Sequence, residues 1–301
     1  MDATPEHELR GALRKEAKLK RKKFLLLIAA ICILAALIML LYPPVSAHFN
    51  RKYQSAVYTE HIRQTQELDV DIQGQTRDRA SAYNRAIKSG GNTFTADSLR
   101  KAMRSYDEQL DINGDGMMGG VEIPKIGVKL PIYHGTGDAT LTHGAGHLLG
   151  SSLPIGGPGT HTILTAHSGM AGDRMFSDLP DLEEGDIFYL HVLGDKLAYQ
   201  VDEITVSAPE DTSHLTIAEG EDRCTLVTCT PFGVNTHRLL VRGTRITEEE
   251  AEVQEQKMDR RAVLSVWMGQ YIKGVSIATG AVAVLIGGYF LMRHRRKKGE
   301  K

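Results

Sequence analysis

The chain has few cysteines and almost no net charge, and both shortages limit what it can be. Its 301 residues contain three cysteines and carry a formal net charge of −1. Cys224 and Cys229 lie five residues apart in one strand-like segment, so side-chain alternation puts them on opposite faces and disfavours a disulfide. Cys32 lies in a long apolar run. The sequence therefore shows no disulfide framework, and its charge gives no reason to expect nucleic acid as a partner.

Two long runs without a charge flank a more polar middle. Residues 24–42 and 274–292 each form an uncharged run of 19 residues. A helix of that length spans about 28 Å, close to the hydrocarbon thickness of a bilayer. We therefore predict two transmembrane helices. Basic residues gather just outside both runs, at Lys18, Lys20, Arg21, Lys22 and Lys23 before the first, and at Arg293, Arg295, Arg296, Lys297 and Lys298 after the second.

These basic clusters orient the chain, because positive residues favour the cytoplasmic side. We expect basic cytoplasmic tails at residues 1–23 and 293–301 and an extracellular middle at residues 43–273. A cleaved signal peptide is the alternative, since Val45-Ser46-Ala47 is similar to a cleavage site. The first run is longer than such a signal usually is, and Pro43-Pro44 fits the end of an anchor helix. We favour an uncleaved anchor.

The extracellular part changes character near residue 118. Residues 43–110 are polar and predict a helical extension, with helices over 55–67, 77–88 and 99–110 and a loop, a possible lid, near 89–100. Residues 249–273 predict a juxtamembrane linker that begins as a helix. Between them, residues 111–248 contain many short strand-like segments, which is typical of an antiparallel barrel or sandwich. The strand candidates lie at 121–133, 161–166, 187–192, 197–206, 225–229 and 239–245.

The segment from Thr225 to Leu239 contains the strongest chemical signal. A β-branched run ends in Cys229, a turn-rich stretch follows, and Arg238 opens the next apolar run. A thiolate is a strong nucleophile, and a guanidinium can hold a substrate carbonyl or a developing oxyanion. Arg242 has the same strand parity as Arg238 but lies farther from Cys229. The arrangement suggests a cysteine acyl-transfer site, against the simpler interpretation of a buried structural cysteine.

A thiol nucleophile needs a base, and two histidines compete for that role. His161 and His167 lie at the two ends of the strand predicted over residues 161–166. His161 is its first residue, and His167 comes directly after it and before Ser168-Gly169. A histidine at the end of a strand lies at the rim of a barrel and can activate a neighbouring thiol. The residues alone leave both candidates open. No third, acidic partner is apparent.

A second motif predicts different chemistry. Asp111, Asn113, Asp115, Gly116 and Glu122 have the spacing of an EF-hand calcium loop. An EF-hand also needs a helix on each side, whereas the residues after Gly120 predict a strand. A polar turn that leads into this strand explains the same residues. A calcium-binding surface module using Asp111–Glu122 remains the non-enzymatic alternative.

Several of these motifs together resemble the class C, pilin-polymerising sortases of Gram-positive bacteria. The similarity covers roughly residues 106–292. It implies a mainly β fold: a closed eight-stranded sortase-type barrel with N-terminal helices and two flanking transmembrane helices. It also implies that Cys229 is the nucleophile, His167 the histidine and Arg238 the arginine of the catalytic site. The motifs are Thr-Leu-Val-Thr-Cys-Thr-Pro-Phe-Gly at 225–233, Asn-Thr-His-Arg-Leu at 235–239, Ala-His-Ser-Gly at 166–169, Gly-Asp-Gly at 114–116, Ile-Pro-Lys-Ile at 123–126 and Gly-His-Leu-Leu-Gly-Ser-Ser-Leu-Pro at 146–154.

The resemblance further implies the activity and its partners. We expect a transpeptidase of the outer membrane face that cleaves Leu-Pro-x-Thr-Gly-like sorting signals between Thr and Gly and joins them to a lysine amine of another pilin subunit, without metal or organic cofactor. A housekeeping sortase that anchors surface proteins to the cell wall is the alternative within the family. The Asp-Pro-aromatic lid motif of many class C sortases is absent from the sequence, and Phe94 and Asp97 are its possible replacements.

Overall fold

The strands of the protein close into one barrel. The computed structural model describes residues 5–89, 105–169 and 173–257, and in the C-terminal segment residues 269, 271–280, 282, 284, 287 and 288. The strands pair in the order β1-β2-β3-β4-β7-β8-β6-β5, and β1 pairs with β5 to close the sheet. They are β1 (Met117–Ile123), β2 (Val128–His134), β3 (Ala145–His147), β4 (Thr160–Thr165), β5 (Ile187–Val192), β6 (Asp195–Ser207), β7 (Asp222–Thr230) and β8 (His237–Ile246). The predicted eight-stranded barrel is confirmed.

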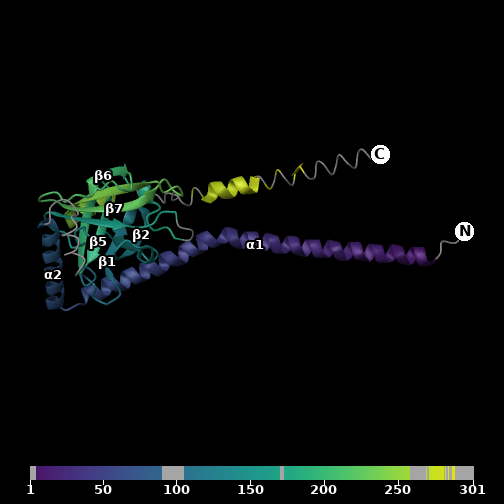
Figure 1. Cartoon of the computed structure of the whole chain (residues 1–301), viewed down its shortest axis with the longest axis horizontal. Helices are drawn as coiled ribbons and strands as arrows, with labels where there is room; N and C mark the ends of the chain where they lie inside the picture. The colour runs from purple at the N-terminus through teal and green to yellow at the C-terminus, as the bar shows by residue number, and fades with distance from the viewer. Residues whose placement is uncertain are drawn as a thin grey trace.

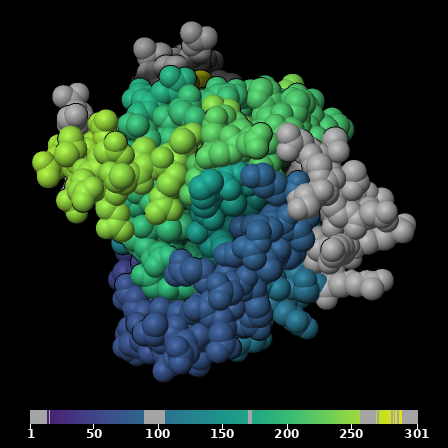
Figure 2. All heavy atoms as spheres, turned by 90° about the vertical axis from the view of Figure 1, so that its left-hand side faces the viewer, coloured from purple at the N-terminus to yellow at the C-terminus, as the bar shows by residue number. Residues whose placement is uncertain are grey.

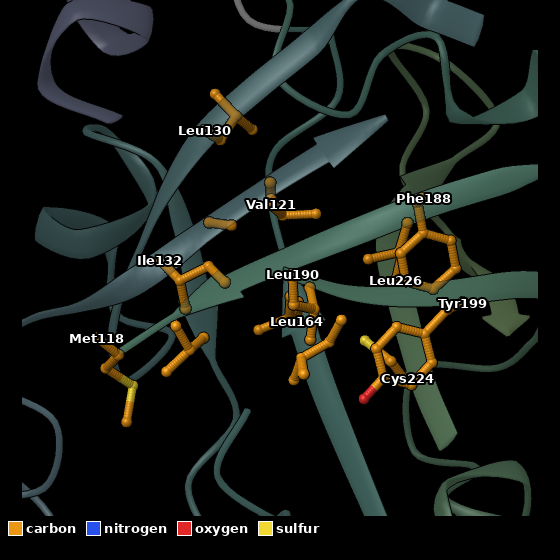
Figure 3. Packing of buried hydrophobic residues seen from close by; sticks show 14 of the residues in the cluster. Met118, Val121, Leu130, Ile132, Leu164, Phe188, Leu190, Tyr199, Cys224 and Leu226 are labelled. Atoms are coloured by element: carbon orange, nitrogen blue, oxygen red, sulfur yellow. The ribbon is translucent and has the colours of Figure 1, made fainter. Parts of the chain in front are cut away.

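Alternation along these strands fills the barrel interior. Figure 3 shows inward-facing side chains from different strands meeting in one cluster, among them Val121, Leu164, Tyr199 and Leu226. The segment 121–133 forms two strands, because the 3₁₀ turn η1 (Pro124–Ile126) interrupts it. Strand β3 was not predicted, since its three residues include a glycine and are too few to show a period of two.

Helices precede and follow the barrel strands in the chain. They are α1 (Pro5–Gln66), α2 (Val70–Ser89), the single turn α4 (Asp138–Leu141) and α5 (Glu248–Lys257), with short 3₁₀ turns η2 (Leu179–Asp181) and η3 (Ser213–Leu215). The N-terminal half of α1 extends away from the barrel, and α1 changes direction before it reaches the strands (Figure 1). Figure 2 shows the barrel-side part of α1 lying together with α2, both in blue, against the barrel.

The apolar N-terminal run lies within α1, as expected for a membrane span. Glu16–Gln66 contains a stretch long and apolar enough to cross a bilayer, and it is the single such helix in the described part of the chain. The helix continues through Pro43 and Pro44, so the prediction that these prolines end it is wrong. Proline weakens a helix locally, but the packing of later turns on the barrel maintains it. Of the second predicted span, 274–280 is helical, and most of the rest lies outside the described residues.

Other predictions for the N-terminal extension had mixed outcomes. The helices expected over 55–67 and 77–88 lie within α1 and α2. The helix expected over 99–110 is not formed in its described part, because residues 105–110 make turns. The possible lid near 89–100, with Phe94 and Asp97, lies outside the described residues apart from Ser89.

The barrel-facing side of α1 is held by polar as well as apolar contacts. Tyr58 packs over Gly120 of β1, where an added Cβ would lie 2.3 Å from ring carbons of Tyr58. Its hydroxyl donates to Glu122 Oε2 at 3.2 Å, and the ring of His191 lies edge-on to Tyr58. Glu122 also pairs with Lys129 at 2.8 Å. His191 Nε2 lies 3.2 Å from the same Glu122 Oε2. The Glu122 carboxylate thus connects α1 with strands β1, β2 and β5.

Acid is expected to weaken this contact. Hydrogen bonds from His191 and Lys129 lower the pKa of Glu122 to about 2, against an unfolded value near 4.5. Because the folded pKa is the lower one, the stabilisation is complete above about pH 4.5 and is lost as the pH falls toward 2. A Glu122→Gln variant should lose about 1–3 kcal/mol of folding free energy at neutral pH. Its melting temperature should also change less than that of the wild type between about pH 4.5 and pH 2. Thermal unfolding of both proteins across this pH range checks the prediction. Melting temperatures that fall in parallel for the wild type and the variant would contradict it.

Candidate active site

Cys229 and Arg238 lie opposite one another on neighbouring strands. In the antiparallel β7–β8 pair, Cys229 is the register partner of Arg238. Directly opposed residues point to the same face, with Cβ atoms about 4.5–5.5 Å apart. That face is the outer one, because Val227 and Leu240 of the same parity belong to a cluster outside the barrel core. Both Cys229 and Arg238 are half-buried, so the thiol and the guanidinium share a surface that a substrate can reach.

The parallel pairing of β4 with β7 brings His167 to the same place. Thr165 is the register partner of Val227, and the backbone ladder continues with Ala166 N–H donating to Val227 O at 3.1 Å. The ladder ends at this pair, and His167 follows Thr165 by two residues as Cys229 follows Val227 by two. The hydroxyl of Ser168 donates to Cys229 O at 2.6 Å and holds the two ends together. The three residues predicted for the catalytic site therefore meet at one end of β4, β7 and β8.

His161, the rival histidine, has a structural role. Its side chain is 1% exposed, and its ring nitrogens contact Thr216 O at 2.9 Å and Thr225 Oγ1 at 2.7 Å. Burial lowers its pKa to about 4. Its register partner, Arg223, precedes Cys229 by six residues, which is about 20 Å along a strand. His167, by contrast, is half-buried, and within the described part of the chain nothing hydrogen-bonds its ring.

The two candidate arginines also differ in whether other side chains already bind them. Arg242 is engaged by carboxylates, with Nε 3.0 Å from Asp202 Oδ1 and a second pair to Glu203. Arg238 donates to two backbone carbonyls only, Asn235 O at 3.3 Å and His237 O at 3.1 Å. No carboxylate among the described residues pairs with Arg238. Its guanidinium is the one available for an incoming carbonyl.

Cys224 lies on the opposite face of β7, as alternation predicts. It is fully buried in the barrel core and is visible there beside Tyr199 in Figure 3. Burial, reinforced by the charge of Asp222, raises the pKa of the Cys224 thiol well above its usual value. This thiol stays protonated and inert. The two cysteines of one strand thus lie in different environments, one buried and one partly exposed.

The structure adds contacts that the sequence did not assign. Phe232, in the turn after Cys229, lies over Gly169, where an added Cβ would be 3.4 Å from its ring. Gly169 has φ +76, a backbone conformation that favours glycine, whereas the contact with Phe232 alone would leave room for a Cβ. Ser207 is the register partner of Arg238 on β6, and its buried hydroxyl has no hydrogen-bond partner among the residues that the structure describes. Phe232 and Gly169 belong to the family motifs at 225–233 and 166–169 but had no predicted role, and no sequence pattern pointed to Ser207.

The calcium motif is used to build a turn. The Asp111 carboxylate accepts the backbone N–H groups of Asp115 and Gly116 at 3.0 and 3.1 Å. The chain then enters β1 at Met117, so the second helix of an EF-hand is not formed. Glu122, the expected twelfth-position ligand, is held by the α1 contacts described above. The described residues contain no group of three or more acidic, histidine or cysteine side chains that could hold a metal ion.

Comparisons with known proteins point to one family. Residues 121–246 match the family described as Sortase domain. Sortase C1 from Streptococcus agalactiae is 43% identical with a TM-score of 0.60, covering 64% of this chain and 100% of that one. Sortase C from Streptococcus pneumoniae is 40% identical with a TM-score of 0.56, covering 64% and 96%. Sortase C from Clostridium perfringens is 36% identical with a TM-score of 0.54, covering 64% and 98%.

Curated relatives match over a shorter region. Sortase A of Streptococcus agalactiae is 31% identical over 117 residues, and sortase D of Bacillus subtilis is 31% identical over 130 residues. The chain spans 47% and 63% of the length of these two proteins. The barrel topology, the shared end of β4, β7 and β8, and the full coverage of a solved sortase C at 43% identity lead to one conclusion. The chain belongs to the sortase family.

Proposed function

We propose that the chain is a membrane-anchored class C sortase that polymerises pilins. It cleaves a Leu-Pro-x-Thr-Gly-like sorting signal between Thr and Gly and joins the threonine carbonyl to a lysine amine of another pilin subunit. One observation carries the proposal. Cys229 and Arg238 are register partners on a half-exposed face, with His167 at the end of the adjoining strand.

In the first half of the reaction, the Cys229 thiolate attacks the threonine carbonyl. Arg238, directly across the ladder, donates to the substrate carbonyl or to the oxyanion that forms. The C–N bond to glycine then breaks, and protonated His167 gives its proton to the leaving amine. The product is a thioester between Cys229 and the sorted protein.

In the second half, the lysine amine attacks the thioester. Neutral His167 takes the proton that the amine loses, the C–S bond breaks, and the thiolate of Cys229 returns. An isopeptide bond joins the two pilin subunits. No metal or organic cofactor takes part in these steps.

The class C assignment is supported by relatives rather than by a single residue. The sortase C structure from Streptococcus pneumoniae concerns pilin substrate specificity, and the Clostridium perfringens enzyme was solved with the C-terminal cell wall sorting motif. Sortase A relatives also match, at lower identity over shorter lengths. Pilin joining is therefore favoured over anchoring of surface proteins to the cell wall.

The membrane arrangement is part of the proposal. The apolar stretch within α1, with its basic N-terminal flank, is proposed as the first span, and residues 274–292 with their basic C-terminal flank as the second. Both termini are then cytoplasmic, and the barrel lies on the extracellular face. A substrate still held in the membrane by its own C-terminal apolar tail would meet the enzyme there.

Intact-protein mass spectrometry of the full chain in detergent tests this function. Incubation with a Leu-Pro-x-Thr-Gly peptide should add the mass of the acyl fragment at Cys229, and hydroxylamine should remove it. A lysine-containing pilin peptide should then resolve the thioester faster than an amine from a cell-wall peptide. Preference for the wall amine would favour the housekeeping alternative, and the absence of any acyl-enzyme would contradict the sortase mechanism.

A further inference from the structure

A turn that follows His167 holds the chain at the histidine and just after it through two hydrogen bonds. The backbone N–H of Phe176 donates to His167 O at 3.1 Å. Two residues past the histidine, the N–H of Gly169 donates to Ser177 Oγ at 3.0 Å. Residues 173–178, defined here as the support turn, therefore control where the His167 backbone lies.

The support turn is itself organised by one buried carboxylate. Asp173 is 7% exposed, and its Oδ1 accepts the N–H of Met175 at 3.4 Å. Met175 has φ +35, in the region that residues other than glycine rarely adopt. Ser177 N–H donates to Arg174 O at 2.7 Å and closes the turn. Because Met175 precedes Phe176, the Asp173 contact acts on the residue next to the one that holds His167.

The second oxygen of this carboxylate binds α1. Gln54 Nε2 donates to Asp173 Oδ2 at 2.7 Å, across 119 residues of sequence, and Gln54 is 5% exposed. Arg51, one turn earlier on α1, is close enough for its charge to act on Asp173, Arg174 and Asp178. Arg174 and Asp178 form an ion pair within the support turn. The helix that contains the apolar N-terminal stretch therefore contacts the turn that holds the histidine.

A polar pair at this position is not the simplest way to dock a helix. Two apolar side chains of similar size would bury without the desolvation of an amide and a carboxylate, and such replacements are often neutral or stabilising. A directional hydrogen bond instead fixes position. A second polar contact of α1, from Tyr58 to Glu122, reaches β1 and does not involve the support turn. The hydrogen bond from Gln54 to Asp173 connects α1 to the turn that holds the His167 backbone.

We propose that Gln54 and Asp173 are positioning residues for His167, through which α1 sets the catalytic geometry of the site. The inference rests on the proposed function, since it takes His167 as the proton donor to the leaving amine. Neither residue touches the substrate. Loss of their hydrogen bond lets the support turn relax and moves the imidazole away from the amine that it must protonate, while the Cys229 thiol and the substrate surface remain.

The test compares two acyl donors that differ only in the leaving group. In a Leu-Pro-x-Thr-Gly peptide the leaving group is the glycine amine, which needs a proton from His167. A p-nitrophenyl ester of the same Leu-Pro-x-Thr sequence releases p-nitrophenolate, which leaves without a proton. With the full chain in detergent, Gln54→Ala should lower kcat for the peptide by about tenfold to a hundredfold and leave its KM near the wild-type value. The rate with the ester should fall by less than about threefold.

Tyr58→Phe is the matched control, because it removes one hydrogen bond between the same helix and the barrel without touching the support turn. It should leave the ratio of peptide to ester rates unchanged. Asp173→Asn, which keeps the side-chain shape and loses one of the two acceptors, should change that ratio in the same direction as Gln54→Ala. It also serves if Gln54→Ala fails to fold.

The outcomes separate this inference from the proposed function. If the wild-type protein forms the thioester but both Gln54→Ala and Asp173→Asn lose peptide and ester activity equally, or lose neither, the positioning role is wrong. If the wild-type protein forms no thioester with either donor, the proposed function itself fails.

Discussion

A Cys229→Ala variant is expected to form no acyl-enzyme and to release no amine from a Leu-Pro-x-Thr-Gly peptide. Alanine has no nucleophile, so the covalent path is lost altogether, whereas removing one stabilising donor costs about a hundredfold to a thousandfold. The measurement is the mass of the intact protein after incubation, together with the released glycine peptide. Only background hydrolysis should remain.

Cys224→Ala is the control that separates the thiol from its position. Cys224 lies on the same strand but inside the barrel core, where burial raises its pKa and keeps it unreactive. Its replacement should cost about 1 kcal/mol of stability, the order expected for one buried group of this size, and leave acylation intact. Peptide cleavage that survives in Cys229→Ala would refute the proposed mechanism. Cleavage lost in a folded Cys224→Ala protein would do the same.

The strands were predictable from the sequence wherever alternation was long enough to see. Strand β5 was predicted over the residues at which it forms, and β8 was predicted within about two residues at its N-terminal end. Strand β3, with three residues, was not, because its pairing depends on β2 and β4 on either side rather than on its own pattern. The prediction that Pro43-Pro44 ends a helix failed for a related reason. Local propensity favoured a stop, and packing on the barrel maintained the helix.

The candidate site was predictable to the extent that its contacts are local. Cys229 and Arg238 belong to consecutive strands joined by a short turn, so their nearness follows from one hairpin. The choice between His161 and His167 cannot be made from a hairpin, because it depends on the parallel register of β4 against β7. That choice came from family resemblance. Gln54 and Asp173, 119 residues apart, gave no pattern at all, since neither belongs to a motif and only the fold brings them together.

Arg238→Ala is expected to lower kcat/KM by about a hundredfold to a thousandfold while the protein still folds. The side chain is half-buried on a rim, and its two hydrogen bonds go to backbone carbonyls of its own turn, so its loss removes little stability. The cost arises in the reaction, where a donor facing Cys229 is missing when charge develops on the carbonyl oxygen. Peptide turnover and thermal unfolding, measured together, check both parts.

Arg242→Ala provides the matched control on the same strand and face. Arg242 lies across from Thr225, four residues from Cys229 along β7, and its guanidinium is held by Asp202 and Glu203. Its removal should change stability by up to about 1 kcal/mol, as for a partly exposed ion pair, and turnover by less than about threefold. Equal losses of turnover in the two variants would show that the cation near Cys229 acts through general charge and not through its position.

Arg238→Lys refines the argument, because it keeps the charge and changes the geometry. A lysine ammonium is a compact, strongly hydrated donor, whereas a guanidinium presents a planar fork that can hold a carbonyl oxygen and a second acceptor together. If charge alone stabilised the oxyanion, Arg238→Lys would retain most of the activity. Since Arg238 is directly opposite Cys229 in the ladder, we expect direction to matter as well, and kcat/KM to lie between those of Arg238→Ala and wild type.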